Sequence, residues 1–106
     1  GIGTNPDEML VSAASSCYII SLAATLERAG YKDIRINQHS VGTASFENGK
    51  FKMECITHYP KINVDNNHKD NLKKRLLKLL KITDNNCMIS NAIKNNVEVR
   101  IEPTLV

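Results

Sequence analysis

The sequence predicts a single α+β domain in which a long buried helix packs against an antiparallel sheet. Residues 9–26 contain no charged side chain, which is typical of a helix that is buried on every side. Residues 33–41 and 51–59 alternate polar and apolar side chains and are separated by an Asn-Gly turn, as in a β-hairpin. The 106 residues suffice for one domain with a modest core.

The first helix is expected to run from the Asn-Pro pair to Ala29. Asn5 can cap the helix, Pro6 suits its first position, and Glu8 stands three residues after Asn5, as in a capping box. Gly30 is a natural C-terminal stop.

The hairpin turn is expected at residues 47–50, because Asn48 and Gly49 tolerate a positive φ. Pro60 lacks a backbone N–H, so it is expected to end the second strand or to restrict it to an edge.

The C-terminal half predicts two helices and a strand. Leucines recur at helical spacing over Asp70–Ile82, and residues 84–86 are expected to end this helix. A short helix is expected within 87–94. Residues 96–103 alternate apolar and charged side chains, which indicates a half-buried strand and gives the order α-β-β-α-α-β.

Cys17 lies near the middle of the apolar helix. A cysteine in such a helix is most often a small structural hydrophobe. However, Ser15, Ser16 and Ser21 place hydroxyls on the same helix, so polar groups and an apolar wall are expected to line a pocket there. A reactive thiolate would also need a cation or hydrogen-bond donors.

The other two cysteines differ in context. Cys87 follows a polar segment and is expected to begin a short helix, whose N-terminus lowers a thiol pKa. Seventy residues separate it from Cys17, so the spacing alone does not bring the two sulfurs together. Cys55 is predicted to be structural, with its side chain on the same strand face as Met53.

Other site classes are disfavoured, so no cofactor and no metal are expected. Cys55 and His58 are three positions apart on a strand, so their side chains face opposite sides and are not expected to hold one metal ion. His39 or His68 could add a ligand but would not bring this pair together. The lysine-rich segment 69–81 has no interleaved aromatic residues and the net charge is only +3, so neither nucleic acid nor a membrane is an expected partner.

The cellular compartment is expected to be the cytoplasm. Three cysteines are an odd number for a disulfide framework and favour a reducing environment. Serines, a cysteine and a threonine interrupt residues 9–26, which makes a poor membrane span, and no signal peptide is apparent.

Two segments resemble the OsmC/Ohr family of thiol-dependent peroxidases, in its general OsmC-like branch. The first is Gly3-Thr4-Asn5-Pro6-Asp7-Glu8-Met9-Leu10, running to Ala13-Ala14-Ser15-Ser16-Cys17-Tyr18, and the second is Cys87-Met88-Ile89-Ser90-Asn91-Ala92-Ile93, followed by Val97-Glu98-Val99. Their order and the hairpin and helix between them extend the resemblance over nearly the whole chain.

The resemblance implies a function and a set of partners. Cys17 would attack an organic hydroperoxide and become a sulfenic acid, and Cys87 would resolve it as a disulfide. A lipoyl-type dithiol would restore both thiols. The subunits would form an intertwined homodimer, and an apolar wall with hydroxyls around Cys17 would suit the substrate.

Two features depart from the family pattern. Asp7 stands where the family usually has Glu, and it remains a candidate site residue, although a first-turn acid can also simply serve the helix dipole. Family members carry strands before the Asn-Pro segment, with an arginine that pairs with the thiolate. No arginine of this sequence matches the position of that family arginine; the four are Arg28, Arg35, Arg75 and Arg100.

Three explanations of the second departure remain open. Residues 1–106 are expected to form one OsmC-like domain without that N-terminal β segment: as a fragment, as a chain completed by another, or as a protein that has lost the thiolate stabiliser. A non-enzymatic redox sensor or small-ligand-binding protein is the alternative function. A binding protein needs neither sulfur, and a sensor needs a disulfide without turnover.

Overall fold

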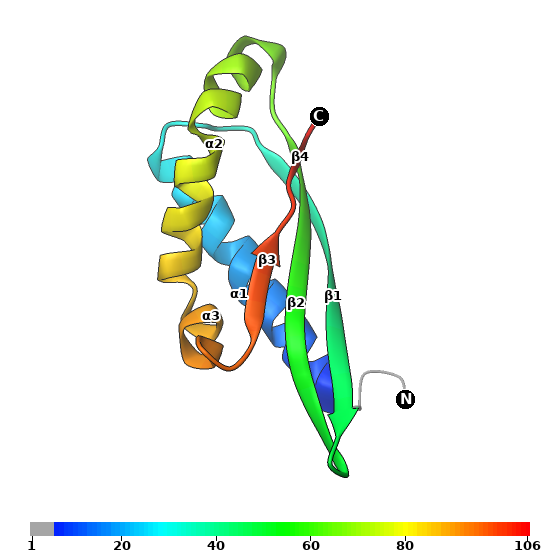
Figure 1. Cartoon of the computed structure of the whole chain (residues 1–106). Helices are drawn as coiled ribbons and strands as arrows, with labels where there is room; N and C mark the ends of the chain where they lie inside the picture. Colours follow the sequence, from blue (N-terminus) through cyan, green and yellow to red (C-terminus); the bar gives the residue numbers. More distant parts are fainter. Residues whose placement is uncertain (1–5) are drawn as a thin grey trace.

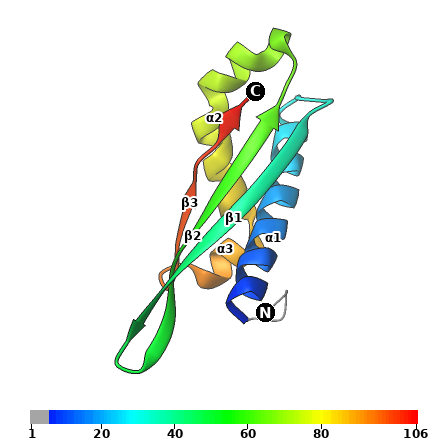
Figure 2. The same cartoon turned by 90° about the vertical axis from the view of Figure 1, so that its right-hand side faces the viewer.

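The structure is a computed structural model that describes residues 6–106 as one sheet with its helices on one face (Figures 1 and 2). The elements are α1 (Pro6–Arg28), β1 (Arg35–Glu47), β2 (Lys50–Asn63), α2 (Asn66–Asn86), α3 (Met88–Ile93), β3 (Glu98–Ile101) and β4 (Thr104–Leu105). The α+β class is confirmed, and the expected order gains one short final strand.

α1 begins at Pro6 and ends at Arg28, close to the expected bounds, and Gly30 follows with φ +98°. Asn5, the expected cap, lies outside the described residues. One face of α1 is buried, and its members are Ala14, Tyr18, Leu22, Thr25 and Leu26. The opposite face is open, and Ile20 is 69% exposed. The expectation of burial on every side is therefore not met within the single chain, because the sheet and the other helices cover only one side.

α1 is long and apolar enough, by length and composition, to cross a membrane. This is weak evidence, because core helices of globular proteins meet the same criterion. Its buried face packs against β1 and α2 in the structure.

The sheet is mixed. β1 and β2 form the predicted antiparallel hairpin, and its turn has Asn48 at φ +54° and Gly49 at φ +75°. β3 and β4 pair with β2 in parallel, so the antiparallel arrangement holds for the hairpin but not for the whole sheet. A parallel neighbour reached through α2 and α3 has no signal in the strand pattern itself.

β2 continues through Pro60 to Asn63, contrary to the expectation that Pro60 ends or edges the strand. Pro60 is buried and lies opposite Gln38 of β1. On the other side, the pairing with β3 ends at His58 and the pairing with β4 begins at Lys61. Pro60 therefore falls in the gap between β3 and β4, where its missing N–H removes no ladder bond on that side.

A β-bulge changes the faces of β2. Thr43 pairs with Cys55 but Ala44 pairs with Met53, so Glu54 is the extra residue. Ile56 and Met53 both lie on the face toward α1, where Met53 approaches Gly42. Cys55 therefore lies on the outer face, opposite Met53, and the expectation of a shared face is wrong because the bulge breaks the period of two.

α2 begins earlier and ends later than the expected 70–82. Asp65 caps it and accepts a hydrogen bond from the His68 N–H at 3.1 Å. The helix continues through the polar segment to Asn86. The core under the helices consists of Tyr18, Leu22, Leu26, Tyr31, Ile62, Val64, Leu72, Leu79, Leu80 and Cys87.

Candidate active site

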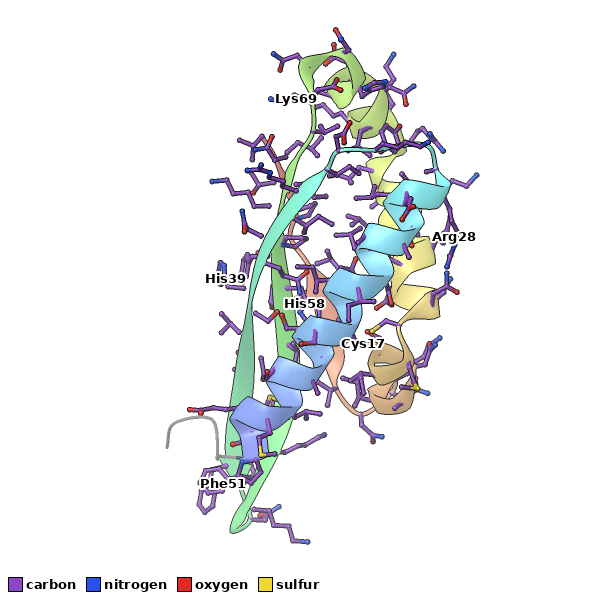
Figure 3. The ribbon with its side chains drawn as sticks, turned by 180° about the vertical axis from the view of Figure 1, so that it is seen from behind. Cys17, Arg28, His39, Phe51, His58 and Lys69 are labelled. Atoms are coloured by element: carbon purple, nitrogen blue, oxygen red, sulfur yellow. The ribbon has the colours of Figure 1, made fainter. Side chains whose placement is uncertain are left out.

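Cys17 is half-buried at the middle of α1 and packs against the core cluster that contains Cys87. Figure 3 shows its side chain directed away from the sheet's hairpin strands, toward the other helices. α1 contacts both α2 and α3 in this region. The thiol therefore lies where three helices meet, rather than within the open face of α1.

Cys87 is fully buried at the junction between α2 and α3. It ends α2 and is the N-cap of α3, so the expectation that it begins a short helix is confirmed. The side chains of Cys17 and Cys87 lie near enough that each thiol acts on the pKa of the other. The fold thus brings together two thiols that are seventy residues apart in the chain.

The surroundings of Cys17 favour its thiolate. Burial acts to raise the pKa of Cys17, but backbone N–H groups of Ile89 and Met88 and the side chains of Cys87 and Ser21 act in the opposite direction. Together they hold the pKa of Cys17 below its ordinary value. The donors of the first turn of α3 therefore act on the neighbouring Cys17 thiol.

The surroundings of Cys87 favour its neutral thiol. Burial raises the pKa of Cys87, and the neighbouring Cys17 adds to the effect. Ser90 acts to lower it without outweighing burial. The lowered pKa expected from the helix N-terminus is therefore wrong for Cys87, because desolvation exceeds the stabilisation that a short helix supplies.

Four further residues around this pair each have a buried polar side-chain atom, and none of them was predicted as a site residue from the sequence. They are Tyr18, His58, Asp84 and Ser90. The rings of Tyr18 and His58 stack with centroids 5.0 Å apart, and His58 Nδ1 lies 2.5 Å from Ser40 Oγ. Burial lowers the pKa of His58, partly offset by Asp84, which favours a neutral imidazole. The only sequence signal was the position of Tyr18 next to Cys17.

A cavity with a volume of about 700 Å³ lies beside the first half of α1, between that helix and β1. Its lining includes Ser15, Ser16 and Gln38 but not Cys17. Gln38 Nε2 donates to the carbonyl and the hydroxyl of Ser15, both at 3.0 Å. The expected pocket of hydroxyls exists, but the thiol does not line it, and of the three serines only Ser21 acts on the pKa of Cys17.

Asp7 is exposed in the first turn of α1 and lines the same cavity. Ten residues of continuous helix separate it from Cys17, which is ~15 Å along the axis. The structure therefore brings Cys17 and Cys87 together but does not bring Asp7 to them.

Within residues 6–106, no group of three or more His, Cys, Asp or Glu side chains is arranged to hold a metal ion. The pair considered from the sequence is split between the faces of β2. His58 faces α1, where it stacks on Tyr18, and Cys55 lies on the outer face.

Three comparisons relate the chain to known proteins. The family model described as OsmC-like protein matches residues 1–102. The uncharacterized protein YmaD of Bacillus subtilis (strain 168) is 39% identical over 105 residues, which are 99% of this chain and 70% of YmaD.

Solved structures show the same fold. The organic hydroperoxide resistance protein OhrB of Bacillus subtilis matches 98% of this chain and 73% of its own, with a TM-score of 0.78 at 20% identity. The OsmC-like protein of Mycoplasma pneumoniae matches 100% of this chain and 74% of its own, with a TM-score of 0.81 at 15% identity.

Proposed function

The chain belongs to the OsmC-like protein family, and we propose that it is a thiol-dependent peroxidase that reduces organic hydroperoxides through Cys17 and Cys87. The observation that carries the proposal is that Cys17 packs against the core cluster containing Cys87, where the pKa values of the two thiols move in opposite directions. A nucleophile needs thiolate character and access, and a resolving thiol needs protection until the first has reacted.

The proposed chemistry has two steps. The Cys17 thiolate attacks the peroxide, the O–O bond breaks, and sulfur is oxidised by two electrons to a sulfenic acid while the alkoxide takes a proton and leaves as an alcohol. The Cys87 sulfur then attacks the sulfenic sulfur, forming the Cys17–Cys87 disulfide and releasing water. A dithiol reductant of the lipoyl type returns both thiols by exchange and is itself oxidised to a disulfide.

The geometry at α3 supports the first step. Backbone N–H groups of Met88 and Ile89 favour a negative charge on Cys17 without a charged side chain. The helix α3, which begins directly after Cys87, therefore also stabilises the thiolate of Cys17. Asp7 remains a proposed site residue only because it lines the cavity beside the first half of α1.

A homodimer is part of the proposal. Ile20 and Met9 are 69% and 57% exposed on a helix that is otherwise rich in apolar and small residues. A second copy covering this face would remove these exposed apolar side chains from water. Light scattering over a range of concentrations should give twice the mass of 11.8 kDa, and a monomer at all concentrations would contradict this part.

Free thiols accord with a cytoplasmic location.

The decisive experiment counts thiols and measures intact mass before and after one equivalent of an organic hydroperoxide such as cumene hydroperoxide. The expected result is the loss of two of the three thiols, with a disulfide mapped between Cys17 and Cys87 and Cys55 still free. A Cys55→Ser variant is the matched control and should lose the same two thiols. Three thiols that remain free would contradict the proposal.

The cavity favours one alternative function, a small-ligand-binding protein. Its volume of about 700 Å³ suits a small molecule, and its lining does not include Cys17. Saturable binding of an apolar ligand that is unchanged in a Cys17→Ala, Cys87→Ala double variant, together with no peroxide turnover, would favour this function. A redox sensor would form the disulfide stoichiometrically and show no turnover with a dithiol.

A further inference from the structure

A serine and a histidine meet on the face of the hairpin that packs toward α1. Ser40 of β1 and His58 of β2 are directly opposite each other in the register of the two strands. Ser40 Oγ lies 2.5 Å from His58 Nδ1, within hydrogen-bond distance. The thiol chemistry proposed above uses neither side chain. A hydroxyl within hydrogen-bond reach of a base is the arrangement that activates a serine as a nucleophile.

His58 is held in a fixed orientation beside Ser40. Its ring is fully buried between the hairpin and α1 and stacks on the ring of Tyr18, with centroids 5.0 Å apart and planes 19° apart (Figure 3). Burial lowers the pKa of His58, so the imidazole is neutral near pH 7 and keeps a lone pair. In the tautomer with its proton on Nε2, Nδ1 accepts the hydrogen bond from the Ser40 hydroxyl.

Ser40 is reachable from a cavity. Its side chain is half-buried and lines the cavity of about 700 Å³ between α1 and β1. The apolar side chains of the lining are Val11, Ile19, Val41 and Met53. Apolar walls with a few convergent polar groups are typical of sites that bind small organic molecules. The hydroxyl that His58 contacts is therefore exposed to any molecule that enters this cavity.

The cavity also holds a hydroxyl that can stabilise negative charge. Attack on a carbonyl produces an oxyanion, which needs hydrogen-bond donors around it. Ser15 lines the same cavity, and its Oγ accepts a hydrogen bond from Gln38 Nε2 at 3.0 Å. The proton of the Ser15 hydroxyl is thus left to donate to a bound molecule. Asp7 and Glu8 add two carboxylates to the lining, which disfavours substrates that are themselves anionic.

We propose that Ser40 and His58 form a nucleophile–base pair that hydrolyses small neutral carboxylic esters in the cavity between α1 and β1. Ser40 supplies the attacking oxygen, His58 takes and returns the proton, and the Ser15 hydroxyl donates to the oxyanion. This activity goes beyond the proposed thiol chemistry and needs neither Cys17 nor Cys87.

The reaction has two steps. Ser40 Oγ attacks the ester carbonyl while its proton passes to His58 Nδ1, and the bond between the carbonyl carbon and the alcohol oxygen then breaks. The alcohol oxygen keeps the electron pair of that bond, takes the proton from His58 and leaves, so that Ser40 is acylated. Water attacks the acyl group in the same way, its proton returns through His58 to Ser40 Oγ, and the carboxylic acid leaves.

The first test is covalent labelling with phenylmethanesulfonyl fluoride, a small neutral reagent that sulfonylates activated serines and releases fluoride. Peptide mapping by mass spectrometry should place the label on Ser40. The parent chain and a Cys17→Ala, Cys87→Ala double variant should be labelled alike, because the thiols take no part. A hydrogen bond that serves only the packing of the hairpin would leave Ser40 unlabelled.

The second test measures turnover of p-nitrophenyl butyrate in the Cys17→Ala, Cys87→Ala background, where these two thiols cannot attack the ester. Ser40→Ala should lower the rate on the order of 100-fold or more, and His58→Gln should slow both turnover and sulfonylation of Ser40 on the order of 100-fold. Ser12→Ala and Ser16→Ala remove other hydroxyls from the same cavity and are the matched controls. Both controls should behave as the background protein, and circular dichroism should show the same fold throughout.

Three outcomes overturn the inference: no label on Ser40 in the parent, turnover that is unchanged in Ser40→Ala, or a label spread evenly over the serines of the cavity. If His58→Gln does not fold, the mapped label and the Ser40→Ala rate still decide. If Ser40 reacts but the parent does not reduce an organic hydroperoxide, the ester activity stands and the thiol-dependent function fails.

Discussion

The middle of α1 and the α2–α3 junction each place one thiol at the same point of the molecule, yet they treat it in opposite ways. Cys17 comes from a helix with one open face, and the N–H groups of a neighbouring helix, together with the side chains of Cys87 and Ser21, outweigh its burial. Cys87 sits at the start of that neighbouring helix and is fully buried, so desolvation outweighs the donors around it. The helix that carries one thiol stabilises the charge of the other.

This difference shows that a cysteine at a helix N-terminus is not activated by its position alone. Whether the pKa falls depends on which sulfur the free N–H groups face and on how much water each sulfur retains. At this site the donors belong to Met88 and Ile89 and act on Cys17. The pair is therefore asymmetric before any oxidant arrives.

Removal of the more acidic thiol gives the largest expected effect. Cys17→Ser should reduce turnover of an organic hydroperoxide with a dithiol to background, at least roughly 10³-fold, because no other thiolate can take its place. Circular dichroism and thermal unfolding should remain close to those of the parent, since Cys17 is only half-buried. Activity retained in this variant would contradict the assignment of Cys17 as the thiol that attacks the peroxide.

Removal of the protected thiol should stop the cycle after one turnover. Cys87→Ala should consume one equivalent of peroxide and then accumulate sulfenic and sulfinic acid at Cys17, visible by mass spectrometry. Alanine is preferred to serine, because a hydroxyl at this fully buried position would cost about 1–3 kcal/mol if left unpaired. Steady turnover at the parent rate would show that Cys87 does not resolve the intermediate.

The pH dependence of alkylation measures the asymmetry directly. Iodoacetamide reacts with thiolates, so the modification of Cys17 should have its midpoint below pH 9.0 and that of Cys87 above it. Single variants should move the midpoints in opposite directions. Cys17→Ala removes a neighbour that raises the pKa of Cys87 and should lower that midpoint, and Cys87→Ala removes a donor to Cys17 and should raise the other. Midpoints that coincide, or that do not respond, would contradict the assignment.

A substitution far from the thiols should change stability and leave the asymmetry intact. A Cβ at residue 42 would lie 2.5 Å from Val11 Cγ2, so Gly42→Ala should lower the free energy of unfolding by about 1–3 kcal/mol. The alkylation midpoints should not move, and adding Val11→Ala should recover much of the loss. A shift of the Cys17 midpoint in Gly42→Ala would mean that the thiol environment extends further along α1 than its contacts indicate.

Local chemistry explains what the sequence predicted well. Pro6 and Gly30 delimit α1, and Asn48-Gly49 forms the hairpin turn, because each of these residues has a backbone preference that acts without distant partners. The short helix after Cys87 also followed from its polar start.

The remaining features arise from contacts between distant segments. The continuation of β2 through Pro60 depends on where β3 ends and β4 begins, and the raised pKa of Cys87 depends on burial under α1. The cluster around Tyr18 needs residues from four elements, and its members on β2 and α2, His58 and Asp84, carry no local pattern. Residue spacing reports one helix or one strand at a time and does not report such assemblies.

The extra residue at Glu54 also constrains how this chain can diverge. The bulge reverses the alternation of side chains between the two faces of β2. Gaining or losing one residue there would move the side chains of residues 50–53 to the opposite face of the sheet. Residues 55–58 would keep their pairing with β3, and His58 would keep its place against Tyr18. The hairpin tip and the thiol site can thus accumulate changes as separate units, and an alignment of relatives should place its single-residue gaps at this position.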